Sequence, residues 1–393
     1  MTVALYVFWL LAAVYAWALV GYPALMAVLG RAGKPRRQGR TTLSRLSLII
    51  PAHNEESVLQ AKLENALGCS HRKHQLEILV ASDGSTDRTV EIARGFEGRG
   101  VRVLDFPMRR GKASVLNDAV RAASGDVVCL CDANVMFQPD ALRRLAARLE
   151  DPRVGAASGD VRLASDESDF GRGERLYYWL ERSLQLGESR VGSMIGVDGG
   201  MYVLRKELFR PLPPDTILDD FTTTMNVIRQ GKRVVYEPAA VATENGTPSS
   251  RDEFGRRVRV TAGAVQSIKR GYWPPLWRPI ELWQYVSHKL LRWLGPVWLV
   301  LLLVSSAALW DSGMVYRTAF AAQAFFYLLA GAAALWPGFR KTHVGGAAFY
   351  FVMSHVAMAV GLVKGLLNLQ PGAWKRTKRT AAPGSSTVAS TSP

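Results

Sequence analysis

The sequence predicts an α/β fold with a mostly parallel sheet, placed between apolar segments at both ends of the chain. Three short, continuous apolar runs each end in a polar cluster, and stretches with helical periodicity separate these runs. Strands buried on both faces have this composition, and strand–helix alternation is typical of a parallel sheet. Long uncharged stretches near both termini predict membrane helices.

The predicted strands of the opening unit precede three polar clusters. The strands are Leu46–Ile50, Leu76–Ala81 and Asp126–Cys131, and helical patterns cover residues 55–67 and 86–96. In parallel sheets, ligands bind beyond the carboxyl ends of the strands. The first candidates for a binding site are therefore the clusters at residues 53–55, 83–85 and 132–134.

The predicted soluble domain spans residues 47–270. Beyond the opening unit, helices are expected at 140–151, 166–188, 217–231 and 254–270, and strands are expected after the glycine-rich turn at Gly196 and at 233–241. The last of these helices is strongly basic.

Residues 1–30 predict an N-terminal transmembrane helix. The apolar stretch Val3–Leu29 is long enough for one tilted span, and it is too long and lacks the basic start of a cleaved signal peptide. A basic linker at 31–46 follows, and such flanks favour the cytosolic side of a membrane. We therefore expect Met1 outside and the linker in the cytosol.

The C-terminal third predicts an interfacial segment and about three membrane helices. Residues 271–292 combine Trp and Pro with spaced charges, and apolar spans fill 293–366 at 293–310, 318–336 and 344–363. The tail at 367–393 is basic and then disordered. Four crossings would leave the tail outside, whereas its basic run at 375–379 favours the cytosol. Either one C-terminal segment does not cross, the last being the weakest candidate, or the charge rule fails.

Composition narrows the class of partner. The net charge is +16, and much of it comes from two compact basic runs beside apolar spans, without interleaved aromatic residues. This pattern favours anionic lipid over nucleic acid. The three cysteines have no CxxC or His-rich company, so reduced thiols are expected.

Two carboxylates follow predicted strands. Asp83 can accept hydrogen bonds from a ribose hydroxyl or a base N–H, or it can belong to a turn that caps a helix. Asp132 is a hard oxygen ligand for Mg²⁺ or Mn²⁺ beside a diphosphate, and Asn134 can add a neutral oxygen. An Asx turn is the other interpretation of this pair.

Three cations and two adjacent acids complete the candidates. Lys112 lies where the chain turns into a helix, which favours phosphate or a solvated basic turn. Arg256 and Arg259 share a helix face that suits a diphosphate or anionic lipid. Adjacent Asp219 and Asp220 repel, and partial burial raises one pKa, as a general base for a sugar hydroxyl requires; a helix N-cap pair is the alternative.

Taken in order, these segments resemble the membrane-bound family 2 glycosyltransferases, the group that includes synthases of cellulose, hyaluronan, chitin and poly-N-acetylglucosamine. The resemblance covers about residues 47–270 and the flanking spans, and it rests on the series IPAHNEE, VASDGSTD, RGKASVLN, CDAN, GVDGGMYVLRKELF, LDDF and RRVRV. It implies a GT-A fold in a cytosolic catalytic domain of an integral protein of the inner or plasma membrane.

The resemblance also assigns roles to individual residues. It implies donor-nucleotide binding by Pro51, Ala52, Asn54, Glu55, Asp83, Lys112 and Asp132. Arg256 and Arg259 would hold the diphosphate, and Asp132 and Asn134 would hold Mg²⁺ or Mn²⁺. Asp198, Gly199 and Asp219 would meet the acceptor, and Asp220 would be the catalytic base.

The implied reaction is an inverting single displacement. The donor implied by the resemblance is a nucleotide sugar, a UDP-sugar, and the acceptor is a glycan or a lipid-linked glycan of cell-surface or extracellular polysaccharide synthesis. Subunits of a polysaccharide export system are possible partners.

Two departures from the family pattern bear on the acceptor. Asn134 replaces the second Asp of the metal motif, and Arg256 and Val260 stand where QxxRW has Gln and Trp. In processive members those residues border the acceptor sugar, so a short or lipid-linked acceptor is favoured over a processive polysaccharide synthase. A membrane-tethered nucleotidyltransferase is a further alternative, and a non-catalytic membrane protein would need intramembrane charge pairs that the spans almost lack.

Overall fold

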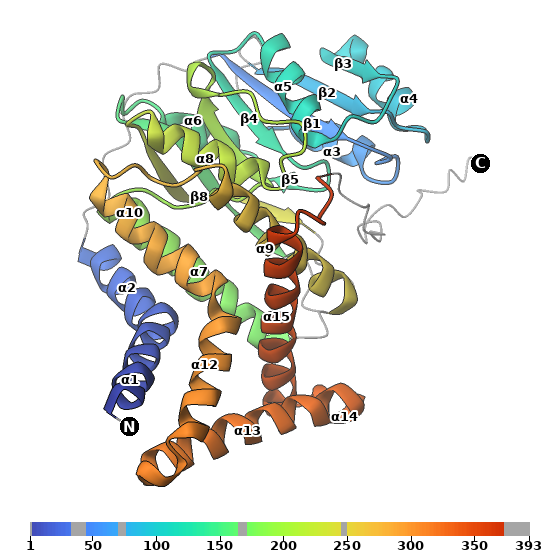
Figure 1. The fold of residues 1–393 in the computed structure, drawn as a ribbon. Helices are drawn as coiled ribbons and strands as arrows, with labels where there is room; N and C mark the ends of the chain where they lie inside the picture. The colour runs from blue at the N-terminus through green and yellow to red at the C-terminus, as the bar shows by residue number, and fades with distance from the viewer. Residues whose placement is uncertain (1, 33–44, 70–75, 164–170, 245–249, 373–393) are drawn as a thin grey trace.

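The computed structural model describes residues 2–32, 45–69, 76–163, 171–244 and 250–372, with the side chains of 171–179 left out. A curved sheet with helices on both faces forms the upper part of the molecule in Figure 1, and helices from both ends of the chain lie below it. The predicted α/β fold with apolar helices at both ends is confirmed. Most of the predicted basic linker and tail, residues 33–44 and 373–393, lies outside the described residues.

One sheet has the strand order β3-β2-β1-β4-β7-β6-β8-β5. Strands β1 to β4 pair in parallel, β7 runs antiparallel to both of its neighbours, and β6 pairs in parallel with β8. The sheet is thus parallel in its first half and mixed in its second. The strands are β1 (Leu46–Ala52), β2 (Leu76–Asp83), β3 (Val101–Phe106), β4 (Val127–Cys131), β5 (Met136–Phe137), β6 (Val154–Leu163), β7 (Met201–Arg205) and β8 (Arg233–Glu244).

The central strand β1 is buried along its whole length, as its continuous apolar composition predicts. Its register places Pro51 beside Ala81 and Ile49 beside both Leu79 and Leu130. The carboxyl ends of β1, β2 and β4 therefore meet at one edge of the sheet, and the polar clusters that follow them are brought together.

Helices cover both faces of the sheet and supply two apolar cores. One core takes side chains from α3 (Leu59–Leu67), α4 (Thr89–Arg94) and α6 (Ala141–Arg148). The other takes side chains from α5 (Lys112–Ala122) and α8 (Asp219–Arg229). This second core carries the two helix starts that reach the strand ends.

Three strands, β3, β5 and β6, were not predicted, and helix α3 begins later than expected. Helix α3 begins at Leu59 rather than near residue 55, because Asn54 adopts a positive φ of 57° and the chain turns there. Strand β6 was not predicted, since its small residues resemble a turn. Its glycines are needed for close packing: a Cβ on Gly159 would lie 2.7 Å from the Ala240 carbonyl oxygen. The edge strand β3 was missed as well.

A second group of helices lies between the sheet and the terminal helices. It comprises α7 (Gly171–Val191), α9 (Ser250–Lys269), α10 (Pro279–Tyr285), the π-helix η5 (Val286–Leu290) and α11 (Leu291–Trp293). The predicted interfacial segment at 271–292 therefore forms a helical strut that leads from the sheet domain to the C-terminal helices (Figure 1).

The terminal helices contain three candidate membrane spans within the described residues. They are Thr2–Arg31, Met314–Leu335 and His343–Leu366, and a fourth arises if Pro279–Trp293 and Gly295–Ala308, which meet at 65°, form one broken span. The elements are α1 (Thr2–Ala16), the π-helix η1 (Trp17–Gly21), α2 (Tyr22–Ala32), α12 (Gly295–Ala308), the 3-10 helix η6 (Trp310–Ser312), α13 (Met314–Leu335), α14 (Pro337–Arg340) and α15 (His343–Leu366).

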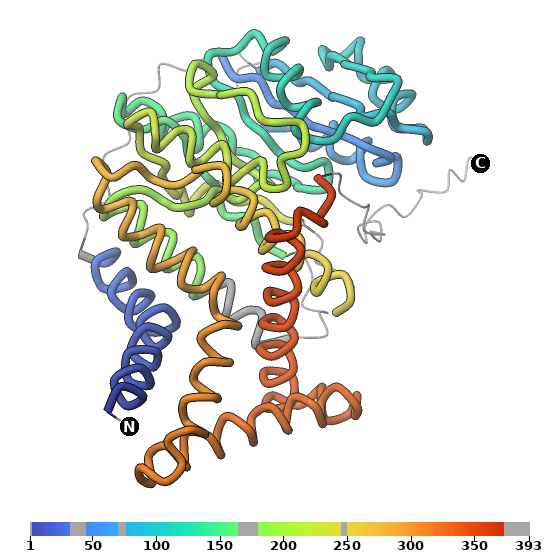
Figure 2. Tube along the Cα trace, viewed as in Figure 1, coloured from blue at the N-terminus to red at the C-terminus, as the bar shows by residue number. Residues whose placement is uncertain are grey.

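Helix α13 runs across the ends of α12 and α15 that lie farthest from the sheet (Figure 1). At this far side, Phe8 packs edge-to-face on Tyr316, with ring centroids 5.1 Å apart. The N-terminal helix and α15 both end beside the sheet domain, as the tube in Figure 2 shows. The chain therefore enters and leaves the helical part on the same side, and this arrangement removes the charge conflict between the linker and the tail.

Helix α15 is fixed to the sheet domain by close packing on α9. A Cβ on Gly361 would lie 2.7 Å from the Val258 carbonyl oxygen, and one on Gly365 would lie 2.7 Å from the Val265 Cβ. Lys269 then donates from its Nζ to the carbonyl oxygens of Gly365 and Leu366, which closes the C-terminal end of α15.

This arrangement predicts the sidedness of single-cysteine labels in membrane vesicles. A cysteine at exposed Ser312 should react with an impermeant maleimide from the face opposite to the sheet domain, whereas one at exposed Leu369 should react from the same face as a reference at exposed Glu97. The native cysteines are buried and give a low background. Labelling of positions 312 and 369 from one face would contradict the arrangement.

Candidate active site

Asp83, at the end of β2, holds the loop that precedes α5. Its Oδ1 accepts the backbone N–H of Arg110 at 2.6 Å, and its Oδ2 accepts that of Gly111 at 3.0 Å. The adjacent Gly84 has a φ of +62°, and a Cβ there would lie 2.6 Å from the Arg109 nitrogen. The buried carboxylate thus shapes the loop, and contact between Asp83 and a nucleoside stays a prediction.

The residues after β1 form a second side of the candidate site, next to the loop that Asp83 holds. The Asn54 Oδ1 accepts the backbone N–H of Thr86 at 2.8 Å, and the N–H of Glu55 donates to Thr89 Oγ1 at 2.8 Å. Pro51 and Ala52 are buried within β1 itself. The two strand-end turns are therefore tied to each other, and this part of the predicted donor site is rigidly built.

Lys112 lies at the centre of the candidate site. It begins α5 directly after Gly111, and its Nζ is 3.0 Å from Asp132 Oδ1 and 3.3 Å from Asp219 Oδ2. Burial alone would lower the pKa of Lys112, but the surrounding carboxylates outweigh it and raise that pKa. Lys112 is therefore a fixed positive charge that joins the end of β4 to the start of α8.

Asp220 occupies the first turn of α8 beside the glycine-rich segment. Its Oδ1 accepts the backbone N–H of Phe221 at 2.7 Å, and a Cβ on Gly199 would lie 2.9 Å from its Oδ2. Burial and then Asp219 raise the pKa of Asp220 to about 6, against the opposing effects of Lys112 and the Phe221 N–H. Asp219 and Asp220 thus lie in the first turn of α8, after the N-cap Leu218, and the role of Asp220 as general base stays a prediction.

Asp198 lies on the other side of Gly199. Its N–H donates to Ser158 Oγ at 2.9 Å, and its Oδ1 accepts the N–H of Gly200 at 2.9 Å. Burial raises the pKa of Asp198 to about 6, and nearby Asp132 adds to the rise while the Gly200 N–H opposes it. The predicted acceptor segment therefore reaches the candidate metal ligand.

The donor set at the end of β4 fits a hard divalent cation. Asp132 offers a partly exposed carboxylate, and the buried Oδ1 of Asn134 has no hydrogen-bond partner within the described residues. No group of three or more His, Cys, Asp or Glu in the described part of the chain is placed to hold a metal. Mg²⁺ or Mn²⁺ would take these two oxygens, with further ligands from a diphosphate and water.

The two arginines predicted at the diphosphate differ in their surroundings. Arg259 donates from Nη2 to the Ile217 carbonyl oxygen at 3.0 Å, and its buried Nε has no partner within the described residues. Arg256 instead forms a two-point ion pair with Glu253, with contacts of 2.7 and 2.9 Å. Arg259 is thus beside the segment that leads into Asp219, and Arg256 is engaged within its own helix.

Sequence patterns did not mark Lys289 as a site residue. A Cβ on Gly196 would lie 3.7 Å from Lys289 Nζ and 3.9 Å from a ring carbon of Phe221, so Lys289 reaches the segment beside Asp220. It belongs to η5, within the segment expected to lie on the membrane surface. The only sequence signal was the clustering of His288, Lys289 and Arg292 inside an otherwise apolar stretch.

The role of Asp83 can be tested by stability. Asp83→Asn should lower the free energy of unfolding by about 1.5–3 kcal/mol, because an amide offers one acceptor where the carboxylate accepts three contacts from two backbone N–H groups. Hydrogen exchange should also speed up at the amides of Arg110 and Gly111. The matched control Asp105→Asn breaks only a surface ion pair with Arg94 and should cost less than about 1 kcal/mol. Equal losses in the two variants would contradict this role.

Comparison with known proteins relates part of the sheet domain to a family of transferases. The glycosyl transferase family 2 model matches residues 47–212. A poly-β-1,6-N-acetyl-D-glucosamine synthase of Staphylococcus epidermidis is 22% identical over 276 residues, which are 69% of this chain and 65% of that protein. Its Staphylococcus aureus counterpart is 25% identical over 236 residues, 58% of this chain and 57% of the relative. The chain thus spans less than two thirds of these relatives' length.

A solved structure shares the fold of nearly the whole chain. It is a mannosyltransferase from Pyrobaculum calidifontis in complex with GDP-Man and Mn²⁺, which is 24% identical, covers 93% of this chain and 100% of its own, and has a TM-score of 0.69. The sheet order and the placement of the terminal helices are therefore those of a known architecture. Residues 47–212 are thus similar to glycosyl transferase family 2, and the sheet domain to which they belong has the GT-A fold.

Proposed function

We propose that the chain is an inverting membrane glycosyltransferase that moves a sugar from a nucleotide sugar, a UDP-sugar, to a glycan or lipid-linked acceptor. The observation that carries the proposal is the meeting of Asp132, Lys112 and Asp220 at one edge of the sheet. Lys112 contacts Asp132 and Asp219, and Asp220 faces the glycine-rich segment at Gly199. Asp132 and Lys112 would therefore stabilise the leaving group, and Asp220, near the same lysine, would activate the nucleophile.

The donor would lie across the ends of β1, β2 and β4. Lys112 is a permanent cation at the start of a helix, a position that stabilises phosphate oxygens. Arg259, with its buried Nε, would add a second positive charge to a departing diphosphate. The choice of UDP comes from the family resemblance, and the GDP-Man of the structural relative makes a GDP-sugar the natural competitor in a donor screen.

The acceptor would be activated by Asp220. A carboxylate with a pKa of about 6 is ionised at neutral pH and still basic enough to accept a proton from a sugar hydroxyl. Because one displacement inverts the anomeric carbon, an α-linked donor would give a β-linked product. Asp198, Gly199 and Asp219 would position the attacking hydroxyl.

A divalent cation, Mg²⁺ or Mn²⁺, would offset the charge that develops on the departing nucleotide. Asp132 would hold it together with Asn134, whose buried Oδ1 lacks a partner within the described residues. The Mn²⁺ in the structural relative supports the same class of ion.

The sheet domain would lie in the cytosol at the plasma membrane. The helix that ends at Ala32 and the helix that ends at Leu366 both lead toward basic sequence on the side of the sheet. Positive flanks favour the cytosolic face. The named relatives support a role in polysaccharide synthesis, in which export subunits would be partners.

A processive polysaccharide synthase is the second candidate function. The names of the staphylococcal relatives favour it. Arg256 and Val260, which replace the Gln and Trp of the acceptor-side motif, favour a single transfer instead. Product length, measured by mass spectrometry after a donor screen, separates the two candidates.

Replacement of the base gives the main test. Asp220→Asn should lower sugar transfer at least a thousandfold while leaving nucleotide affinity within about threefold, because it removes proton acceptance at one atom only. It should also raise Tm at pH 8, because the ionised carboxylate of Asp220 is disfavoured by folding above pH 6.

Asp215→Asn is the matched control for this change. Asp215 lies in the same segment before α8, is 64% exposed and forms only a surface ion pair with Arg270. Its replacement should leave transfer and nucleotide binding at wild-type levels. Wild-type turnover by Asp220→Asn would refute the base assignment.

The pH dependence of kcat/KM gives a second test. The rate should fall below about pH 6, where Asp220 becomes protonated. Asp219→Asn should move this acid limb to lower pH, because Asp219 raises the pKa of Asp220. Without Asp219, the positive charge of Lys112 would also lower the pKa of Asp220 more strongly. An acid limb that stays in place, or moves to higher pH, would contradict the proposed coupling.

A further inference from the structure

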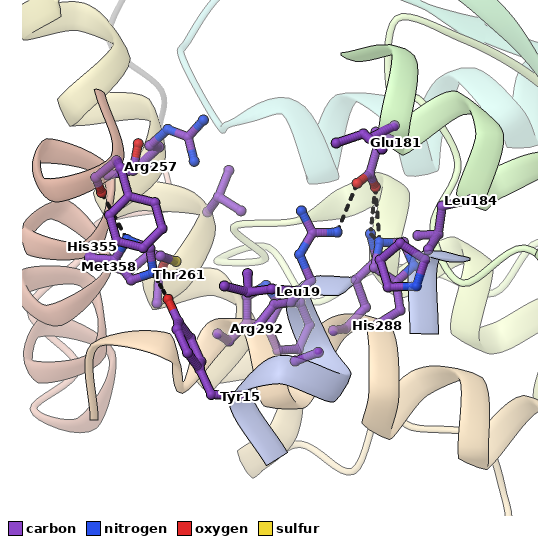
Figure 3. A pocket seen from close by; sticks show the side chains of 18 of the residues that line it. Tyr15, Leu19, Glu181, Leu184, Arg257, Thr261, His288, Arg292, His355 and Met358 are labelled. Atoms are coloured by element: carbon purple, nitrogen blue, oxygen red, sulfur yellow. Dashed lines mark hydrogen bonds and ion pairs between the residues drawn. The ribbon is translucent and has the colours of Figure 1, made fainter. Parts of the chain in front are cut away.

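A cavity of about 470 Å³ lies where the sheet domain meets the terminal helices. Its walls come from the N-terminal helix, α7, α9, η5, α11 and α15, so both ends of the chain and its middle enclose it. Figure 3 shows His355 and Met358 on one side and the charged group of Glu181, His288 and Arg292 on the other, with the Tyr15 hydroxyl 3.1 Å from the His355 Nε2. No sequence motif predicted this cavity.

The part of the cavity nearest the sheet domain is positively charged. Its lining includes Arg257, Lys289 and Arg292 but a single carboxylate, Glu181. Glu181 pairs with Arg292 at 2.9 Å and with Lys289 at 3.5 Å, and these neighbours together with His288 keep its pKa well below the usual range despite burial. When the buried partners Glu188 and Glu253 are counted together with Arg256, which shares Glu253, four cations face three carboxylates.

Much of the remaining lining is apolar, and part of it comes from candidate membrane spans, which also contribute the polar side chains of Tyr15, Ser354 and His355. Leu19 and Pro23 belong to the span Thr2–Arg31, and Phe351 and Met358 belong to the span His343–Leu366. The cavity therefore has one cationic end and one end built from helices that suit a hydrocarbon environment. This division matches an amphiphile with an anionic head group.

The cavity shares a wall with the candidate base. Lys289 and Trp293 line it, Trp293 packs edge-to-face on Phe221 with ring centroids 5.5 Å apart, and Phe221 directly follows Asp220. Lys289 Nζ also approaches Gly196 at the start of the acceptor segment. A group held by Lys289 would thus lie next to the place where an acceptor hydroxyl must be.

Val260 contributes to this space. It lines the cavity from α9, one residue after Arg259, at the position where the resembled family carries Trp. Valine leaves open a volume that an indole ring would fill. The departure that disfavoured a processive enzyme in the sequence is therefore one that keeps room for a bulky, non-saccharide group.

We propose that this cavity binds the polar end of a lipid acceptor, with a phosphate against Lys289 and Arg292 and the hydrocarbon toward α15 and the N-terminal helix. The inference rests on the proposed function and names its acceptor class. Phosphate is favoured because a lipid joined to carbohydrate through a phosphodiester keeps one negative charge, and one joined through a diphosphate keeps two, which suits a site with more than one cation. Carbohydrate linked to that phosphate would extend past Gly196 toward Asp220.

The cations are held in place by buried polar side chains. His288 lies between Glu181 and Glu188, with ring nitrogens 3.0 and 2.9 Å from their carboxylates, and Tyr22 donates to Glu188 at 2.7 Å. These residues position Lys289 and Arg292 and connect the N-terminal helix to the cavity. They are positioning residues, because the phosphate would touch only the cations.

Direct binding tests the proposal without any donor. The purified full-length protein in detergent is titrated with farnesyl phosphate, with farnesol and with inorganic phosphate, and binding is read by the shift in Tm and by tryptophan fluorescence. Farnesyl phosphate should bind at least tenfold more tightly than either of the others. Equal binding of farnesol would mean an apolar cavity only, and equal binding of inorganic phosphate would mean an anion site without a lipid; either result overturns the proposal.

Two variants, one that removes a charge and one that fills space, test whether the ligand binds in this cavity. Lys289→Gln and Val260→Trp should each weaken farnesyl phosphate binding at least tenfold, the first by loss of charge and the second by loss of space, and Lys289→Arg should restore most of it. Arg121→Gln removes the same charge from a side chain that is 78% exposed on the sheet domain, and it should bind as the wild type does. Gel filtration shows whether each variant is folded.

The outcomes separate this inference from the proposed function. Wild-type binding by both Lys289→Gln and Val260→Trp would overturn the cavity assignment, but it would not contradict the proposed glycosyltransferase function. Conversely, a protein that binds farnesyl phosphate but releases no nucleotide from any nucleotide sugar would overturn the proposed function and leave the cavity assignment standing.

Discussion

The contact of one lysine with two carboxylates, from strand β4 and helix α8, holds the candidate site together. Lys112 lies between Asp132 and Asp219, and without its charge the acids gathered at this edge would repel one another in a partly buried setting. Lys112 does not offset all of this charge, because burial and the neighbouring acids still raise the pKa values of Asp198 and Asp220. A raised pKa of this kind is what the proposed role of Asp220 as general base requires.

The change of strand direction at β7 explains how the proposed donor and acceptor sides of the site come together. The parallel half of the sheet ends in the loops at Asn54, Asp83 and Asp132, which form the proposed donor side of the site. Strand β7 runs the other way, so the glycine-rich segment that begins it arrives at the same edge from outside and brings Asp198 and Gly199. Neither half contains the complete site.

Much of this could be predicted, for identifiable reasons. Strands β1 and β4 are fully buried and β2 is mostly buried, so their apolar composition marks them, and their polar ends meet because parallel strands share an edge of the sheet. Three things lay beyond a sequence pattern. Small residues hid β6, the ion pair with Glu253 separated Arg256 from Arg259, and Lys289 reached the site only through packing of η5. The side on which the chain leaves the helices depended on α13 lying across its neighbours rather than beside them.

The glycine contacts between α15 and α9 have a geometric consequence. Gly361 and Gly365 let the two backbones touch, so the last helix and the sheet domain move as one body. In a bilayer, such a joint would fix the elevation of Asp220 above the hydrocarbon surface. The acceptor atom that receives the sugar would then be selected by its distance from the lipid anchor as much as by its chemistry.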